Sequence, residues 1–262
     1  MSTIRRLAAE AATLLAEAEN VVAFTGAGIS TESGLADFRS PGGLWERYRI
    51  VTYPEFLASH EARVEYRSMR CELIPTLLQA RPNPAHTALA ELERKGKVKG
   101  VITQNIDGLH QDAGGSRVIE LHGTNRSAAC LNCARQWPIA EIQLRTEADD
   151  LDPHCPGCEG LIKPETVSFG QSMPAVAMNA AYALAEECDL MLMIGSSLEV
   201  QPAASFPLVA SLNGVRLIFI NHTATSFDGL ADIICRESAS EFISLLLEEF
   251  AGLADQQGGA GW

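Results

Sequence analysis

The sequence has few basic residues, few aromatic residues and no long apolar run. Its 262 residues include 20 Lys and Arg against 33 Asp and Glu, a formal net charge of −13, and 6% are Phe, Trp or Tyr. A protein that binds nucleic acid needs a basic face to neutralise phosphates. The acidic balance therefore argues against DNA, RNA and anionic membrane surfaces as partners, and no run of about 18 apolar residues could cross a membrane. An acidic surface does tolerate lysine-rich partner segments.

The first 20 residues lack the pattern of a targeting signal. Arg5 and Arg6 are followed by three glutamates, which interrupt the apolar stretch that a signal peptide needs. The apolar residues recur at helical spacing, so we expect an amphipathic surface helix. A cytoplasmic location is the resulting expectation. At about 150 residues per domain, the length fits one large domain with a small companion.

Short apolar runs that end in polar or glycine-rich clusters alternate with helical patterns. The expected strands are 21–24, 98–102, 190–194, 217–220 and 231–234, and the expected helices between and after them are 84–95, 173–188, 202–212 and 240–253. This alternation predicts an α/β fold with a parallel sheet covered on both faces. Ligands of such sheets bind at the carboxyl ends of the strands, where this sequence has Gly, Ser, Asn and Asp.

Two stretches interrupt the alternation. Residues 46–83 read as helical without a strand, and residues 123–161 contain four cysteines, an acidic run and Pro/Gly turns. Both are expected to form a small helical and metal-binding module beside the sheet. The large domain would then comprise residues 1–45, 84–122 and 162–255, with residues 256–262 as a tail.

The segment from Gly26 to Ser30 follows an apolar run and precedes an expected helix. Glycines at such a place let backbone N–H groups approach a pyrophosphate at a helix N-terminus. The full dinucleotide fingerprint is not met, because Thr31 stands in place of the third glycine, and a simple tight turn remains an alternative. The continuation brings Asp37, Phe38 and Arg39 together among small residues, as a flap over a bound nucleotide would.

Four of the seven cysteines form two pairs with the spacing of zinc knuckles. Cys130 and Cys133 are followed, after 21 residues, by Cys155 and Cys158. Four thiolates complete the coordination of one zinc ion, which would make the site structural rather than catalytic. Four unrelated buried cysteines are the alternative. The other three cysteines are expected to be small core residues.

A polar segment at residues 103–110 follows the second expected strand, and His122 comes shortly after it, beside Gly123. A histidine in this place suits a general base near neutral pH, although a single histidine is more often structural. The sequence has no nucleophile elbow, which disfavours a serine hydrolase.

Taken together, the motifs resemble the sirtuin family, of bacterial type, over roughly residues 20–250. The resemblance rests on the segments 26–30, 32–34, 37–39 and 103–107, on His122-Gly123, on the four cysteines, on 195–197 and on Asn221. It implies a Rossmann-like domain with an inserted small domain that carries one structural zinc. It also implies an NAD-dependent protein-lysine deacetylase, in which NAD is consumed as a co-substrate and the acyl group of a lysine ends on ADP-ribose.

The resemblance also implies roles for single residues. His122 would be the base on a ribose hydroxyl, and Asn105 and Asp107 would order the nicotinamide ribose and carboxamide. The implied NAD-binding set is Gly26, Ala27, Gly28, Ser30, Asp37, Phe38, Arg39, Gln104, Asn105, Ile106, Asp107, Gly195, Ser196, Ser197, Asn221, His222 and Ala239. The implied set for the acyl-lysine protein or peptide is Tyr66, Val167, Phe169, Gly170, Leu198 and Val200.

The sequence departs from the family pattern at three places, one in the flap and two near the substrate. Ala36 replaces a proline of the flap, and Gln171 stands where many relatives have Glu. Relatives that remove acidic acyl groups have a Tyr-x-x-Arg pair, but here Met69 stands at the arginine position and Arg70 comes one residue late. One residue turns a helix by about 100°, so Arg70 is expected to point elsewhere and acetyl to be preferred. Longer neutral acyl chains, ADP-ribosyl transfer, NAD hydrolysis and a non-enzymatic NAD-sensing or zinc-scaffold role remain the alternatives.

Overall fold

The computed structural model describes residues 2–37 and 47–256. Its main feature is a six-stranded sheet with the order β3-β2-β1-β7-β8-β9. The strands are β1 (Val21–Thr25), β2 (Val98–Thr103), β3 (Val118–Glu120), β7 (Leu190–Ile194), β8 (Arg216–Ile220) and β9 (Ile233–Cys235). Every adjacent pair is parallel, which confirms the expected α/β fold. Phe38, Arg39 and all of the expected tail except its first residue lie outside the described residues.

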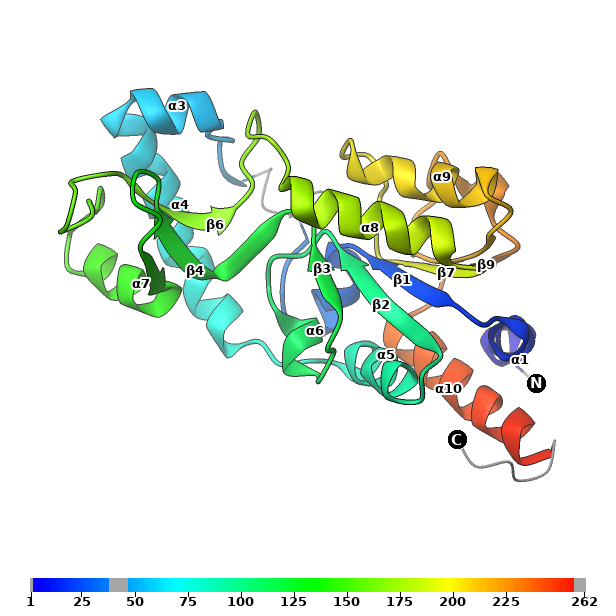
Figure 1. Ribbon diagram of the computed structural model, residues 1–262. Coiled ribbons are helices and arrows are strands. Elements are labelled where there is room, and N and C mark those ends of the chain that lie inside the picture. Colours follow the sequence, from blue (N-terminus) through cyan, green and yellow to red (C-terminus); the bar gives the residue numbers. More distant parts are fainter. Residues whose placement is uncertain (1, 38–46, 257–262) are drawn as a thin grey trace.

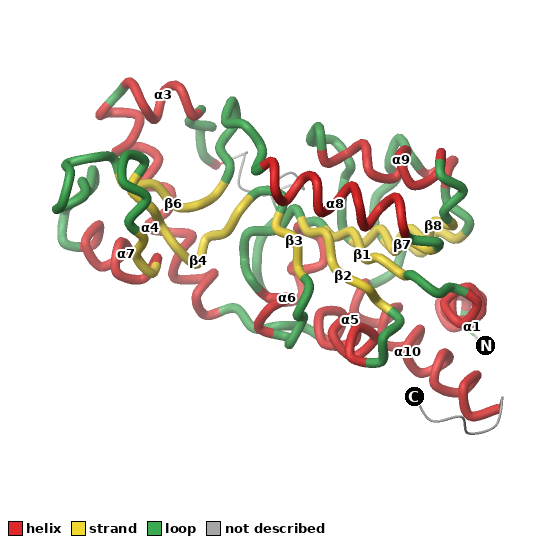
Figure 2. The backbone as a smooth tube through the Cα atoms, in the orientation of Figure 1, coloured by secondary structure: helices red, strands yellow, loops and turns green. Residues whose placement is uncertain are grey.

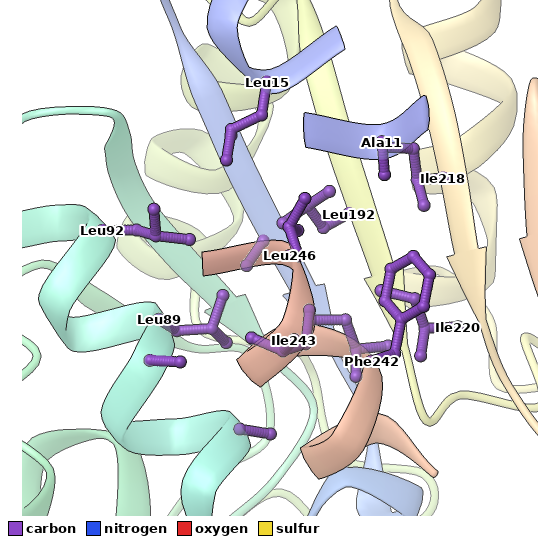
Figure 3. Packing of buried hydrophobic residues seen from close by; sticks show 14 of the residues in the cluster. Ala11, Leu15, Leu89, Leu92, Leu192, Ile218, Ile220, Phe242, Ile243 and Leu246 are labelled. Carbon is purple, nitrogen blue, oxygen red and sulfur yellow. The ribbon is translucent and has the colours of Figure 1, made fainter. Parts of the chain in front are cut away.

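Side chains of the large sheet alternate between two apolar layers, because successive residues of a strand point to opposite faces. On β1, Val21 and Ala23 belong to one core cluster, and Val22 and Phe24 belong to the other. The first layer is covered by α1 (Thr3–Glu17), α5 (Pro84–Arg94) and α10 (Ala239–Gln256), as Figures 1 and 3 show. The second is covered by α8 (Ala175–Glu187) and α9 (Phe206–Leu212). Among the described helices, none is both long enough and apolar enough to span a bilayer.

A smaller unit lies beside the large sheet (Figure 2), at the carboxyl ends of its strands, which the arrows of Figure 1 mark. In the part of the chain that the structure describes, it has a three-stranded sheet in the order β5-β4-β6 and the helices α3, α4 and α7. Its elements are α3 (Tyr53–Ala58), α4 (His60–Gln79), β4 (Gly123–Cys130), β5 (Gln136–Pro138), α7 (Ile139–Glu147) and β6 (Ile162–Thr166). The expected boundary at residue 161 places β6 in the large domain, but β6 pairs antiparallel with β4 and so belongs to the small sheet. The reason is that the chain runs to the cysteine loops along β4 and returns from them along β6 before it reaches α8.

Two histidines are buried beneath the ends of β1 and β2. His86 on α5 and His110 on α6 (Leu109–Asp112) are almost fully buried, and their ring centroids lie 4.8 Å apart. His110 Nε2 lies 2.9 Å from Thr25 Oγ1, and His86 Nδ1 lies 3.0 Å from Asn83 Oδ1. Burial lowers the pKa of His86 to about 4 and that of His110 to about 3. Both rings are therefore neutral in the folded protein near neutral pH.

Mild acid is expected to destabilise this fold. The same imidazoles protonate near a pKa of about 6.5 in the unfolded chain, so the unfolded state binds more protons and stability falls as the pH drops from there toward the folded pKa values. Urea unfolding at about pH 5 should show a loss of about 2 kcal/mol per histidine relative to about pH 7.5. His110→Gln removes one of the two titrations and should weaken this dependence. If the stability of His110→Gln depended on pH as strongly as that of the parent, His110 would not be a source of the pH dependence.

Candidate active site

A cavity of about 410 Å³ lies at the carboxyl ends of β1, β2, β7 and β8, and the small unit forms part of its wall. From the large sheet it is lined by residues that follow those strands, and from the small unit by α4 and the segment after β6. Of the residues expected at the site it is lined by Gly26, Ala27, Gly28, Asp37, Tyr66, Gln104, Asn105, Ile106, His122, Val167, Phe169, Gly170, Gly195, Ser196, Ser197, Val200, Asn221, His222 and Ala239. Residues from distant parts of the sequence thus meet at one place.

The glycines of the first motif allow two strand ends to come into contact. The Gly26 N–H donates to Ile194 O at 2.9 Å, and the Gly28 N–H donates to Gly195 O at 2.8 Å. A Cβ on Gly28 would lie 2.7 Å from the Gly195 Cα. Gly195 itself has φ +62°, in the region that favours glycine. These two N–H groups are used within the protein, so the glycines make room for the backbone rather than offering these donors to a pyrophosphate.

Gly28→Ala should therefore destabilise the protein. The added methyl group meets backbone atoms, which cannot move aside as a flexible side chain can, and overpacking of this kind costs about 1–3 kcal/mol. Thermal unfolding measures the loss. Gly229→Ala is the matched control, because a Cβ on Gly229 has nothing within 4 Å. Equal melting temperatures for the two variants would show that the contact between β1 and β7 tolerates a side chain.

The turn after β2, residues 104–108, is held by a dense set of hydrogen bonds; we call it the β2 turn. Asn105 Nδ2 donates to Gly26 O and to Ser30 Oγ, both at 3.1 Å. Asp107 accepts from Ser30 Oγ at 2.8 Å and from the Leu109 N–H at 2.9 Å. Ser30 and Asp107 are buried and do not line the cavity, so they fix Asn105 from behind.

His122 points its ring into the same region. Its Nδ1 lies 2.9 Å from the backbone oxygen of Gln104. A carbonyl oxygen only accepts hydrogen bonds, so Nδ1 carries the hydrogen and the lone pair of the neutral ring lies on Nε2. Gln104 also donates from Nε2 to Ser196 Oγ at 2.7 Å, which ties the β2 turn to the end of β7. The ring therefore has a fixed tautomer, with a proton acceptor at Nε2.

Two residues near the cavity differ from expectation. Leu198 is 4% exposed and packs in the core cluster under α8 and α9, so its side chain does not line the cavity. Arg70 does line it, although the register of α4 suggests otherwise. The Arg70 backbone position is rotated by about 100° around α4 from that of Met69, but the side chain is long enough to reach the cavity. Its guanidinium carbon lies 4.7 Å from the centroid of the Tyr66 ring.

The far end of the cavity lies over β8 and β9. Asn221 Nδ2 donates to Thr223 O at 2.8 Å, and His222 Nδ1 lies 3.0 Å from Arg236 O. Thr31, Arg49, Thr223 and Glu237 also line the cavity and are not in the expected set. Glu237 could have been found from its place two residues after a strand end, whereas no sequence pattern distinguishes Arg49.

The four paired cysteines form a group that fits a zinc ion. Their sulfur atoms lie within 4.8 Å of one another, with Cys130–Cys158 at 3.5 Å and Cys133–Cys155 at 3.7 Å. A tetrahedron with Zn–S bonds of about 2.3 Å has edges of about 3.8 Å. The backbone N–H of Cys133, together with that of Asn132, lowers the pKa of the Cys130 thiol to about 6, which favours the thiolate that a metal needs. The donor set and its spacing are those of a structural zinc site.

The fold and the cavity define an α/β protein with a ligand-sized cavity at the carboxyl ends of its parallel strands and an inserted module that is suited to a structural metal. Comparison with protein families is more specific: the Sir2 family model matches residues 26–202. The chain belongs to the Sir2 family.

Individual relatives cover nearly the whole chain. The NAD-dependent protein deacetylase of Thermodesulfovibrio yellowstonii is 52% identical over 87% of this chain and 89% of its own length. That of Caldivirga maquilingensis is 44% identical over 93% of this chain and 94% of its own. A solved structure of Sir2 with p53 peptide and NAD+ has a TM-score of 0.85 at 38% identity, and covers 93% of this chain and 98% of that one. Another, with deacetylated p53 peptide and 3'-O-acetyl ADP ribose, has a TM-score of 0.86 at 39% identity, with 92% and 97% covered.

Proposed function

We propose that the chain is an NAD-dependent protein-lysine deacetylase. In this reaction an acetyl-lysine side chain, NAD and water give lysine, acetyl-ADP-ribose and nicotinamide. The observation that carries the proposal is His122, which lies in the cavity with its tautomer fixed by Gln104 O and with Asn105 beside it. Membership of the Sir2 family and relatives named as NAD-dependent protein deacetylases support the same reaction.

We assign His122 Nε2 the role of proton acceptor for a ribose hydroxyl. Asn105 would order the nicotinamide ribose and carboxamide from the β2 turn. Asp107 and Ser30 would act through Asn105, because both are buried behind it. Gly195, Ser196, Ser197 and Asn221 would hold the adenosine half over β7 and β8, with His222 and Ala239 near it.

The acyl-lysine would enter between the segment after β6 and the segment after β7. The Val167 N–H donates to His122 O at 2.8 Å, which fixes the first of these segments beside the proposed base. Phe169 and Val200 line the cavity from either side, and an extended peptide between two such segments would add as a strand. Because Arg70 already donates to Asn125 and Thr166, we expect acetyl to be preferred over acyl groups that carry a carboxylate.

The domain division and location complete the proposal. The Rossmann-like domain (1–45, 84–122 and 167–255) would bind NAD, and the small module (46–83 and 123–166), which includes β6, would hold zinc and form one wall of the peptide site. We place the protein in the cytoplasm, because a reducing compartment keeps four thiols available for metal.

One assay tests the reaction against its alternatives. The purified chain is incubated with NAD and an acetyl-lysine peptide, and nicotinamide and acetyl-ADP-ribose are followed by mass spectrometry. Peptide-dependent acetyl-ADP-ribose is the expected result. ADP-ribose formed without peptide would indicate NAD hydrolysis, and ADP-ribose attached to protein would indicate transferase activity. A chain that leaves NAD intact would contradict the enzyme assignment, and faster removal of succinyl than acetyl would contradict the acyl preference.

A further inference from the structure

Arg70 connects helix α4 to two segments that flank His122. The side chain is nine-tenths buried and lines the cavity. Its Nη2 donates to Thr166 Oγ1 at 3.0 Å, and its Nη1 donates to Asn125 Oδ1. Thr166 and Asn125 lie on the neighbouring strands β6 and β4, so a single guanidinium holds both strands.

Asn125 connects Arg70 to the β2 turn. Its backbone N–H donates to Ile106 O at 2.8 Å, and the next residue, Arg126, donates from Nε to Asp107 O, also at 2.8 Å. Two successive residues of β4 thus hold two successive carbonyls of the β2 turn. Asn125 is 4% exposed, so water does not readily replace Arg70 as the partner of its side-chain oxygen, and losing that partner is costly.

Thr166, the second partner of the Arg70 guanidinium, connects Arg70 to the segment beside His122. It is the last residue of β6, and the following residue, Val167, donates its N–H to His122 O at 2.8 Å. Two hydrogen bonds therefore connect Arg70 with the proposed base along one route, and two connect it with Ile106 along the other. The residues that Arg70 contacts on the two routes, Thr166 and Asn125, are both buried.

Arg70 belongs to a buried basic cluster that stability alone does not explain. Arg67 and Lys163 are 3% and 2% exposed. Burial lowers the pKa of both, and although burial raises the pKa of Tyr66, the charges of Arg70 and Lys163 outweigh it and lower that pKa to about 8. Burying several cations together carries a large desolvation cost. Arg67 Nη2 donates a hydrogen bond to Ile162 O at 2.5 Å. Of the two arginines, Arg70 lines the cavity and Arg67 does not.

We propose that Arg70 is a positioning residue for deacetylation, which fixes the β2 turn through Asn125 and the substrate segment through Thr166. In doing so it sets the place of Ile106 and Asn105 relative to His122. This inference rests on the proposed function and adds a residue of the small module to its machinery. Arg70 touches none of the reacting atoms in this role.

The test compares Arg70→Gln with Arg67→Gln, a matched control on the same helix that also removes a buried cation. Steady-state kinetics with NAD and acetyl-lysine peptide should show kcat lowered about tenfold or more in Arg70→Gln, since small misplacements of reacting groups are costly, with a smaller change in KM for the peptide. Arg70→Lys, which keeps the charge but has no fork of donors, should recover part of kcat. Arg67→Gln should lower the melting temperature and leave kcat near that of the parent.

A double-mutant cycle identifies the route. If Arg70 acts through Asn125, Arg70→Gln in the Asn125→Ala background should lower kcat much less than it does alone, whereas Arg67→Gln should be additive with Asn125→Ala. An unchanged kcat in folded Arg70→Gln, or full additivity with Asn125→Ala, would overturn the inference. A loss confined to the KM for the acylated peptide would also overturn it, because it would mean that Arg70 contacts the acyl group. If Arg70→Gln fails to fold, the kcat of Arg70→Lys decides. An inactive parent chain would instead contradict the proposed function.

Discussion

His122→Ala is expected to lower the rate of acetyl-ADP-ribose formation by about 10²–10⁴-fold, the range that a positioned general base supplies. The imidazole is oriented by Gln104 O, 2.9 Å from Nδ1, and the cavity brings it beside Asn105. Alanine removes the proton acceptor while the Val167 N–H keeps its partner, because that bond is made to the backbone oxygen of residue 122. The measurement is single-turnover formation of acetyl-ADP-ribose with saturating NAD and acetylated peptide.

The affinity for NAD and the melting temperature distinguish the loss of the proposed base, His122, from damage to the NAD site or to the fold. The affinity for NAD, measured by calorimetry, and the melting temperature should stay near those of the parent. His60→Ala is a suitable control, since the His60 side chain is 62% exposed and pairs with Asp152, and neither residue lines the cavity. Near-parental activity in His122→Ala would remove His122 from the mechanism. Equal losses in both variants would point to a general effect on the fold.

The parts of this protein that depend on local patterns could be predicted from its sequence. Runs such as residues 190–194 are buried on both faces of the sheet, so they are continuously apolar and read as strands. The four cysteines were identified from spacing alone, because two Cys-x-x-Cys pairs can meet on one metal wherever the chain between them goes. The β2 turn is predicted because ligand-binding residues gather at strand ends in parallel sheets, whereas His122 is indicated by Gly123 beside it, by its place before the cysteine pairs and by the family resemblance.

What the sequence did not predict depends on contacts between distant segments. β3 is short and partly exposed, and it has its strand geometry because it pairs with β2. The place of Arg70 depends on how its flexible side chain meets Asn125 and Thr166 from two other strands, which the register of α4 does not encode. The N–H groups of Gly26 and Gly28 donate to the carbonyls of Ile194 and Gly195. A sequence motif within residues 26–30 does not predict these hydrogen bonds, because their acceptors lie in a distant segment.

Removing the zinc site is expected to have the second largest effect, and to unfold the small module. That module has a core of few residues, among them Ile74, Ile139, Ile142 and Ile162, packed around Cys130 and Cys155. The large sheet, by contrast, buries many Leu, Ile and Phe side chains at about 1.5–3 kcal/mol each. Zinc binding in small domains supplies about 10–16 kcal/mol at neutral pH, which is as large as the total stability of a whole domain. Cys130→Ser should therefore leave the large domain folded while β4, β5, β6 and α7 lose their order.

Activity should be lost together with this order, because β4 and β6 hold the β2 turn and the substrate segment through Asn125 and Thr166. Elemental analysis of the parent should give one zinc per chain, and Cys130→Ser should give none, with new proteolytic cleavage confined to residues 123–166. Cys71→Ser is the matched control, since Cys71 lies on α4 outside the cysteine group, and it should keep both zinc and activity. A Cys130→Ser protein that retains one zinc and full activity would contradict a four-thiolate site. Retention of activity without zinc would show instead that the small sheet is stable through its own packing.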